Sequence, residues 1–182
     1  MLIGTSQINS IAWVRLYPPS IFIMKKVVYV ETTIPSFYFN QRTQPEIVTL
    51  AKWTCQWWDN YSANFELVSS MAVVEELNYG NYPKQAEKLE FIQKLNFLPI
   101  TSEVIEIVEI YISRQVMPAD PKGDALHVAL ATHHKCDILV SWNCRHIVNY
   151  NKFEHLRKIN TLLGLNTPML VTPLGLLTGE DQ

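Results

Sequence analysis

Cysteine is scarce in this sequence, and its three cysteines include no CxxC pair. An odd number of thiols without that spacing excludes a zinc knuckle and gives no support to a disulfide framework. These residues are Cys55, Cys136 and Cys144. We therefore expect a protein of a reducing compartment and place it in the cytoplasm.

A surplus of positive charge is also missing. The chain has 15 Lys and Arg against 17 Asp and Glu, which leaves a formal net charge of -2. No global field therefore draws the protein to a polyanion, and any contact with nucleic acid has to come from local basic patches. A long apolar run is absent too, because Arg15, Pro18 and Pro19 interrupt the mildly apolar first 23 residues. We expect neither a membrane span nor a targeting segment.

The composition that remains is that of a packed globular domain. Hydrophobic residues make up 48% of the 182 positions and charged residues 18%, which suits one domain with a substantial core. We expect an N-terminal appendage or misassigned start at 1–23, the domain at 24–178 and a tail at 179–182.

Short runs of β-branched and apolar residues alternate with helical patterns along the chain. The runs are residues 27–30, 65–68, 97–100, 138–141 and 169–171. The helical patterns cover residues 44–61, 70–79, 83–95, 102–115, 121–134 and 150–163. This alternation predicts the α/β class, as a three-layer α/β/α sandwich around a central, mainly parallel sheet.

The clearest predicted helix, residues 44–61, follows a capping-box pattern at Thr43 and Glu46. Its apolar and aromatic residues, which include Trp57 and Trp58, recur at three- and four-residue intervals. Such a stripe could be a base-stacking platform, but a core-facing stripe is the more common use of this spacing. We therefore assign the tryptophans to packing.

Acidic and polar residues stand where the predicted strands end. Glu31 follows the first strand, Asn143 closely follows the fourth, and Glu75 and Glu76 lie on the helix after the second. Asp124 lies one turn into an otherwise apolar helix. Because ligands bind beyond the carboxyl ends of parallel strands, these side chains should converge on one cleft. An all-oxygen set of this kind favours Mg²⁺ or Mn²⁺, whereas zinc would recruit His or Cys.

Each of these residues also has a structural interpretation. Glu31 could cap a turn before Pro35, and Glu75 and Glu76 could form a solvated helix face. The spacing of its neighbours turns Glu76 toward the less polar side.

Three further residues near this set are assigned to structural roles. Asp120 is assigned as the N-cap of the helix that contains Asp124. His127 is interpreted as a core histidine, with a catalytic role as the alternative. His146 is assigned to the surface.

Four segments in this order resemble PIN domains of the VapC-toxin type. They are residues 27–33, residues 69–80 with Glu76-Leu77-Asn78-Tyr79-Gly80, residues 124–131, and residues 139–147 with Ser141-Trp142-Asn143. The resemblance runs from about Val27 to Leu177 and implies a metal-dependent ribonuclease. Carried over by position, it places catalytic residues at Glu31, Glu76, Asp124 and Asn143, of which the three acids are the metal ligands. Two positions depart from the family pattern, which usually has Asp where this chain has Glu31 and often has Asp where it has Asn143.

The resemblance implies RNA as the substrate, hydrolysis of its phosphodiester bonds, a small antitoxin protein as partner and a homodimer. The candidate RNA contacts are Ser141, Arg145, Lys152 and Lys158, although a solvated helix face would use the same basic residues. One alternative is a PIN-like module that binds RNA or a protein without cutting. Another is a phosphoacceptor domain, which needs an Asp at the end of a central strand; residues 97–100, taken as that strand, end in Thr101.

Overall fold

The computed structural model describes residues 24–79, 82–120 and 122–177. The predicted appendage and tail lie outside these ranges. Within them the chain forms one parallel sheet in the order β3-β2-β1-β4-β5. Its strands are β1 (Val27–Val30), β2 (Glu66–Ser70), β3 (Asn96–Leu98), β4 (Ile138–Val140) and β5 (Met169–Val171). The predicted fold class is confirmed, and every strand pairing is parallel.

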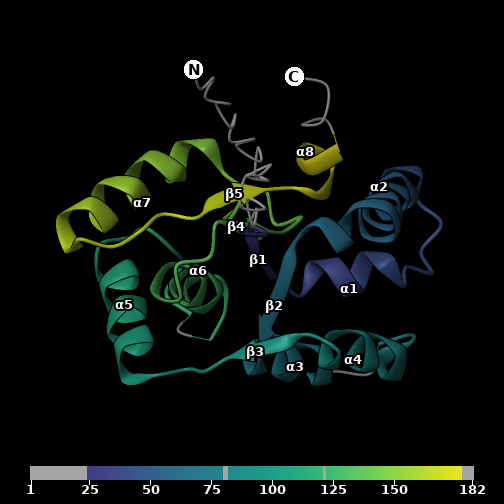
Figure 1. Cartoon of the computed structure of the whole chain (residues 1–182), viewed down its shortest axis with the longest axis horizontal. Coiled ribbons are helices and arrows are strands. Elements are labelled where there is room, and N and C mark those ends of the chain that lie inside the picture. Colours follow the sequence, from purple (N-terminus) through teal and green to yellow (C-terminus); the bar gives the residue numbers. More distant parts are fainter. Residues whose placement is uncertain (1–23, 80–81, 121, 178–182) are drawn as a thin grey trace, which may run out of the picture.

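Helices cover both faces of this sheet, which gives the three layers. Figure 1 shows α5, α6 and α7 on one side of the strands and the other helices on the opposite side. The helices of the first side are α5 (Ser102–Ser113), α6 (Asp124–His133) and α7 (Tyr150–Leu163). Those of the second are α1 (Thr33–Tyr38), α2 (Pro45–Tyr61), α3 (Met71–Asn78), α4 (Gln85–Gln93) and α8 (Pro173–Leu177), with a short 3₁₀ turn at Ser62–Asn64.

The core lies where the central strands meet the helices. The last three residues of β1 are fully buried, as are all three residues of β4. This follows from their apolar sequences, since a parallel strand covered on both faces must be apolar on both. The tryptophan assignment is confirmed for Trp57, which is 0% exposed in α2.

Two predictions about these elements were wrong, and one helix was missed. Helix α2 begins at Pro45 with Gln44 as its N-cap and no side-chain capping bond, so Thr43 and Glu46 form no capping box. Proline suits this first position because its φ is already helical and its missing N–H would have no partner there. The short helix α1 was not predicted, since six residues carry too little periodicity.

The second error concerns β3, which is an edge strand and not a central one. The central strand is β1, and the residue after it is Glu31. A phosphoacceptor domain would need its Asp at this position, and that Asp is missing here too.

Candidate functional site

Glu31 lies at the carboxyl end of the central strand and is only 4% exposed. Its carboxylate turns back onto the next turn of chain, where Oε2 accepts the Thr33 N–H at 3.0 Å and the Thr33 hydroxyl at 2.6 Å. Burial raises the pKa of Glu31, although the charge of His127 and the Thr33 bonds oppose this rise. The Glu31 carboxylate is therefore buried and held in one orientation.

Glu76 reaches the same place from α3, the helix that directly follows β2. The buried residues Val73 and Leu77 fix that helix on the core, so that Glu76 is half-buried while Glu75 is exposed. This agrees with the orientation predicted from spacing. The Thr32 hydroxyl donates to Oε2 of Glu76, and His127 Nε2 lies 3.1 Å from Oε1.

The electrostatics of Glu76 differ from those of Glu31. Burial alone would raise the pKa of Glu76, but the hydrogen bond and charge of His127, with the Thr32 hydroxyl, outweigh it and lower the pKa. Glu76 is therefore held as a carboxylate.

His127 is a core histidine as predicted, at 1% exposed, but it also touches the acidic cluster. Its Nδ1 lies 2.9 Å from the Tyr29 hydroxyl, which is 2.7 Å from the Ser70 hydroxyl. Burial lowers the pKa of His127, but the bond with Glu76 and the charges of Glu31 and Asp124 outweigh it and raise the pKa. The sequence carried one signal for this role, since His127 stands three residues after Asp124 and shares its helix face.

Asp124 is the first residue of α6, with Gly123 as the N-cap. It is therefore not one turn inside the helix, as the sequence suggested, and its half-buried carboxylate stands at the positive end of the helix dipole. Burial raises its pKa, and so does the charge of Glu76, while His146, His127 and Lys152 lower it.

The N-cap assignment of Asp120 was wrong for the same reason. The helix starts later than predicted, and Asp120 Oδ1 instead accepts the Lys122 N–H at 3.0 Å, in a turn before α6. Asn and Asp commonly close such turns with their own side chains. Pro121 lies outside the described residues.

Asn143 orients Asp124 from the loop after β4. Its Nδ2 donates to Asp124 Oδ1 at 2.7 Å, and its own Oδ1 accepts the His146 N–H at 3.1 Å. The Ser141 hydroxyl accepts the Asn143 N–H at 2.8 Å. Ser141 is itself fully buried, so it holds the Asn143 backbone in place and is no surface contact for RNA.

The basic residues predicted to contact RNA, here called the basic rim, are Arg145, Lys152 and Lys158, and they divide into two groups. Lys152 Nζ lies 3.2 Å from His146 Nδ1, and its charge lowers the pKa of Asp124, so this lysine borders the cluster. Arg145 and Lys158 are exposed. His146 was assigned to the surface, but it is only partly exposed and its charge acts on Asp124.

Three side chains come close enough together to share one ion. Ligand atoms of Glu31, Glu76 and His127 all lie within 4.8 Å of one another. Asp124 stands outside this group, although the charge of Glu76 reaches it. The structure thus brings Glu31 and Glu76 together at one point, with Asp124 and Asn143 as a neighbouring bonded pair.

The fold has a counterpart among solved structures. No protein-family model matches the chain, and no curated protein matches it. The chain is similar to one in the crystal structure of VapBC2 from Rickettsia felis bound to a DNA fragment from their promoter. The match has 15% sequence identity and a TM-score of 0.53, and covers 80% of this chain and 98% of the other. At that identity the likeness shows the fold alone.

In the described ranges, no helix is both long and apolar enough to cross a membrane.

Proposed function

We propose that this chain is an endoribonuclease dependent on Mg²⁺ or Mn²⁺, and that Glu31, Glu76 and Asp124 hold the metal. The observation that carries the proposal is the approach of Glu31 and Glu76 within 4.8 Å at the carboxyl end of a parallel sheet, from two different elements. Carboxylates held this close repel one another, and a bound cation relieves that repulsion.

The donor chemistry fits a hard divalent ion. Glu31 and Glu76 would supply oxygen ligands at one point and Asp124 a third from the adjoining pair with Asn143, and an ion of this type keeps several waters as well. His127 contributes a nitrogen to the same group, but an ionised Glu76 only accepts hydrogen bonds, so Nε2 carries the proton and is not free to bind a metal. His127 is thus a positioning residue for Glu76.

The ion, when bound, would activate a water and neutralise charge that develops on a phosphodiester. The chain's own residues prepare the place for it. Thr33 fixes the Glu31 carboxylate, His127 and Thr32 fix that of Glu76, and Asn143 orients Asp124. This is the support from a second layer of hydrogen bonds that metal ligands require.

We further propose that the protein is the toxin of a toxin–antitoxin pair, with a small antitoxin as partner. The support is the sequence resemblance to VapC-type PIN domains, together with the fold likeness to a chain of the VapBC2 structure. Reading the neighbouring genes for a small protein with a DNA-binding end would test this partner. A homodimer, expected from the same resemblance, would be tested by sedimentation.

One observation favours a second function, which is binding without cleavage. Asn143 donates into Asp124 Oδ1, so one oxygen of the third acid is already engaged, and the site has one negative charge fewer than four acids would give. A PIN-like module with a weakened metal site could still hold RNA or a protein partner.

A cleavage assay separates the two functions. Purified protein would be incubated with single-stranded RNA in Mn²⁺, in Mg²⁺ and in chelator, and the products resolved on a gel. The nuclease proposal expects cleavage that needs the metal and disappears in Glu76→Gln. Binding of RNA without cleavage under all three conditions would favour the second function.

A further inference from the structure

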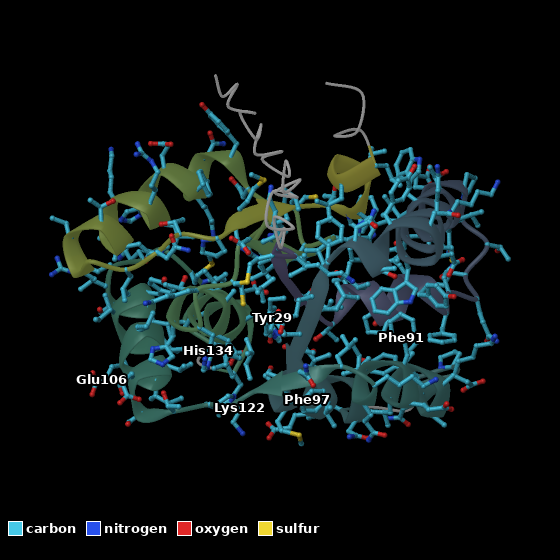
Figure 2. The ribbon with its side chains drawn as sticks, in the orientation of Figure 1. Tyr29, Phe91, Phe97, Glu106, Lys122 and His134 are labelled. Atoms are coloured by element: carbon cyan, nitrogen blue, oxygen red, sulfur yellow. The ribbon has the colours of Figure 1, made fainter. Side chains whose placement is uncertain are left out.

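A large cavity opens beside the acidic cluster. Its volume is about 950 Å³, and Thr32 and Glu76 form part of its wall. The wall also includes Lys122, before α6, and Lys88, in α4. Figure 2 shows Lys122 and the α4 residue Phe91 on opposite sides of β2. The cavity wall thus includes residues of α3, of α4 and of the segment before α6.

Lys88 is unusual among the residues of this wall. It is only 8% exposed, and it forms no ion pair with any residue in 24–79, 82–120 or 122–177. Its ammonium group lies 5.8 Å from the centroid of the Tyr82 ring, which gives it a weak cation–π contact. Because little of this side chain is exposed and no carboxylate of the described residues is bound to it, an anion in the cavity would stabilise its charge.

A second cation belongs to the same cavity wall as Lys88. Arg42, in the loop after α1, lines the same cavity, and its guanidinium carbon lies 5.5 Å from the Phe37 ring centroid. Burial lowers the pKa of Lys88, and the charge of Arg42 lowers it further, while Glu87 opposes both. Two cations in the wall of one cavity form a place where a bound anion would be stabilised.

Exposed aromatic rings accompany these cations. Tyr79 is 85% exposed and Tyr82 is 53% exposed, and both line the cavity. Rings presented to solvent beside positive charge are the combination that single-stranded nucleic acids use, since bases stack on the rings and phosphates meet the cations. An acidic peptide would pair with the cations but would not stack on the rings.

We propose that Lys88 and Arg42 form a phosphate subsite for a single RNA strand, with Tyr82 and Tyr79 as stacking surfaces for its bases. The inference rests on the proposed nuclease function, because the strand would run from Glu76 along the cavity to α4. Cleavage would then occur at a fixed distance from the phosphate held at Lys88. This subsite differs from the basic rim at Lys152, which lies beyond Asp124.

The test measures binding alone, so that it does not depend on cleavage. Anisotropy of a labelled single-stranded oligouridylate would be followed in chelator over a range of salt, for the wild type, Lys88→Met and Arg42→Gln. Each variant should bind about three- to tenfold more weakly and lower the salt slope by about one. Lys52→Met, which removes an exposed lysine of α2 outside the cavity, should change neither quantity.

Melting temperatures guard against a folding artefact. Lys88→Met keeps the length of the side chain and removes a poorly solvated charge, so its melting temperature should equal or exceed that of the wild type. Arg42 is exposed, so Arg42→Gln should leave the fold intact.

Three outcomes would overturn the subsite. The first is unchanged affinity and salt slope in both variants. The second is that the wild type does not bind the oligouridylate, and the third is that it binds an oligoglutamate peptide tightly instead of the oligouridylate. If the wild type cuts no RNA but both variants bind the oligouridylate more weakly, the subsite would be upheld and the nuclease function rejected. Metal-dependent cleavage with unchanged binding in both variants would reject the subsite alone.

Discussion

The imidazole of His127 faces the carboxylate of Glu76, with 3.1 Å between Nε2 and Oε1. On its other side Nδ1 meets the Tyr29 hydroxyl at 2.9 Å, so that both ring nitrogens are engaged inside the core. The strand β1 thus fixes the orientation of a side chain on α3 through a histidine of α6. This connection explains how a surface helix can present one acid in a defined position.

Tyr29→Phe tests that connection. The change leaves His127 Nδ1 and the Ser70 hydroxyl without their partner, so the free energy of unfolding should fall by about 1–2 kcal/mol. Manganese should also bind more weakly, because Glu76 is held less firmly. Chemical denaturation and calorimetric titration would measure the two effects.

Tyr111→Phe is the matched control for this variant. The Tyr111 hydroxyl is also buried and bonds with Thr132 and Asn160, away from the acids. Its loss should cost similar stability and leave manganese affinity unchanged. Equal losses of affinity in both variants would mean that Tyr29 acts only through stability.

Glu31→Gln should stabilise the protein without metal at neutral pH. The folded-state pKa of Glu31 is raised by burial, so the wild type loses stability as pH rises from the unfolded pKa of this group through the folded one. The amide does not ionise and avoids this loss, which is on the order of 1 kcal/mol for each unit of pKa shift. Urea unfolding over a pH series would measure a gain that grows with pH.

The exposed neighbour Glu75 provides the comparison for that experiment. Glu75→Gln removes the same charge from an exposed side chain of α3, so it should not stabilise the protein at neutral pH. A Glu31→Gln variant that is less stable than the wild type at neutral pH would contradict the account that burial makes the charge of Glu31 costly.

Asn143→Asp should tighten manganese binding and destabilise the protein without metal. The amide of Asn143 donates to Asp124 Oδ1, and an Asp there would replace this bond with repulsion between two carboxylates. Added metal would relieve the repulsion, so the shift in melting temperature with manganese should exceed that of the wild type. A smaller shift would show that Asn143 serves the site better as a donor.

Sequence reasoning found the sheet and most helices because apolar periodicity is a local property of the chain. All five strands were predicted, and α7 was predicted at its observed bounds. The strand order could not be read, since it depends on packing between distant segments, and β3 was therefore misplaced. The start of α6 was misjudged because Asp120 and Asp124 are both plausible residues for a helix start.

The site was predicted less completely than the fold. Glu31 was predicted because it directly follows a strand, and the inward orientation of Glu76 was predicted from the spacing of its neighbours. Both features are visible along the chain. The pairing of His127 with Glu76 spans 51 positions, and that of Tyr29 with His127 spans 98. No local pattern carries such contacts. The cavity at Lys88 was missed for the same reason, since a lysine on a polar helix gives no sign of its burial.

Glu31→Asp should lower RNA cleavage, even though Asp is the usual residue at this position in the family that the sequence resembles. In this chain the carboxylate of Glu31 is placed by its length and by Thr33, and shortening it draws the oxygens away from Glu76. A loss of about tenfold in rate would correspond to about 1.4 kcal/mol in the barrier. Rates should be compared at saturating manganese, and an increase would mean that Glu31 is a poorer ligand than Asp.

The most direct test of the acidic site is manganese binding, measured by the electron paramagnetic resonance signal of the free ion. The wild type should bind manganese, whereas Asp124→Asn and Glu76→Gln should lose that binding while remaining folded. Asp120→Asn is the matched control, because Asp120 is an exposed acid that lines the same cavity as Glu76 and accepts the Lys122 N–H in a turn. Binding that survives in Asp124→Asn and Glu76→Gln, or no binding by the wild type, would contradict the account.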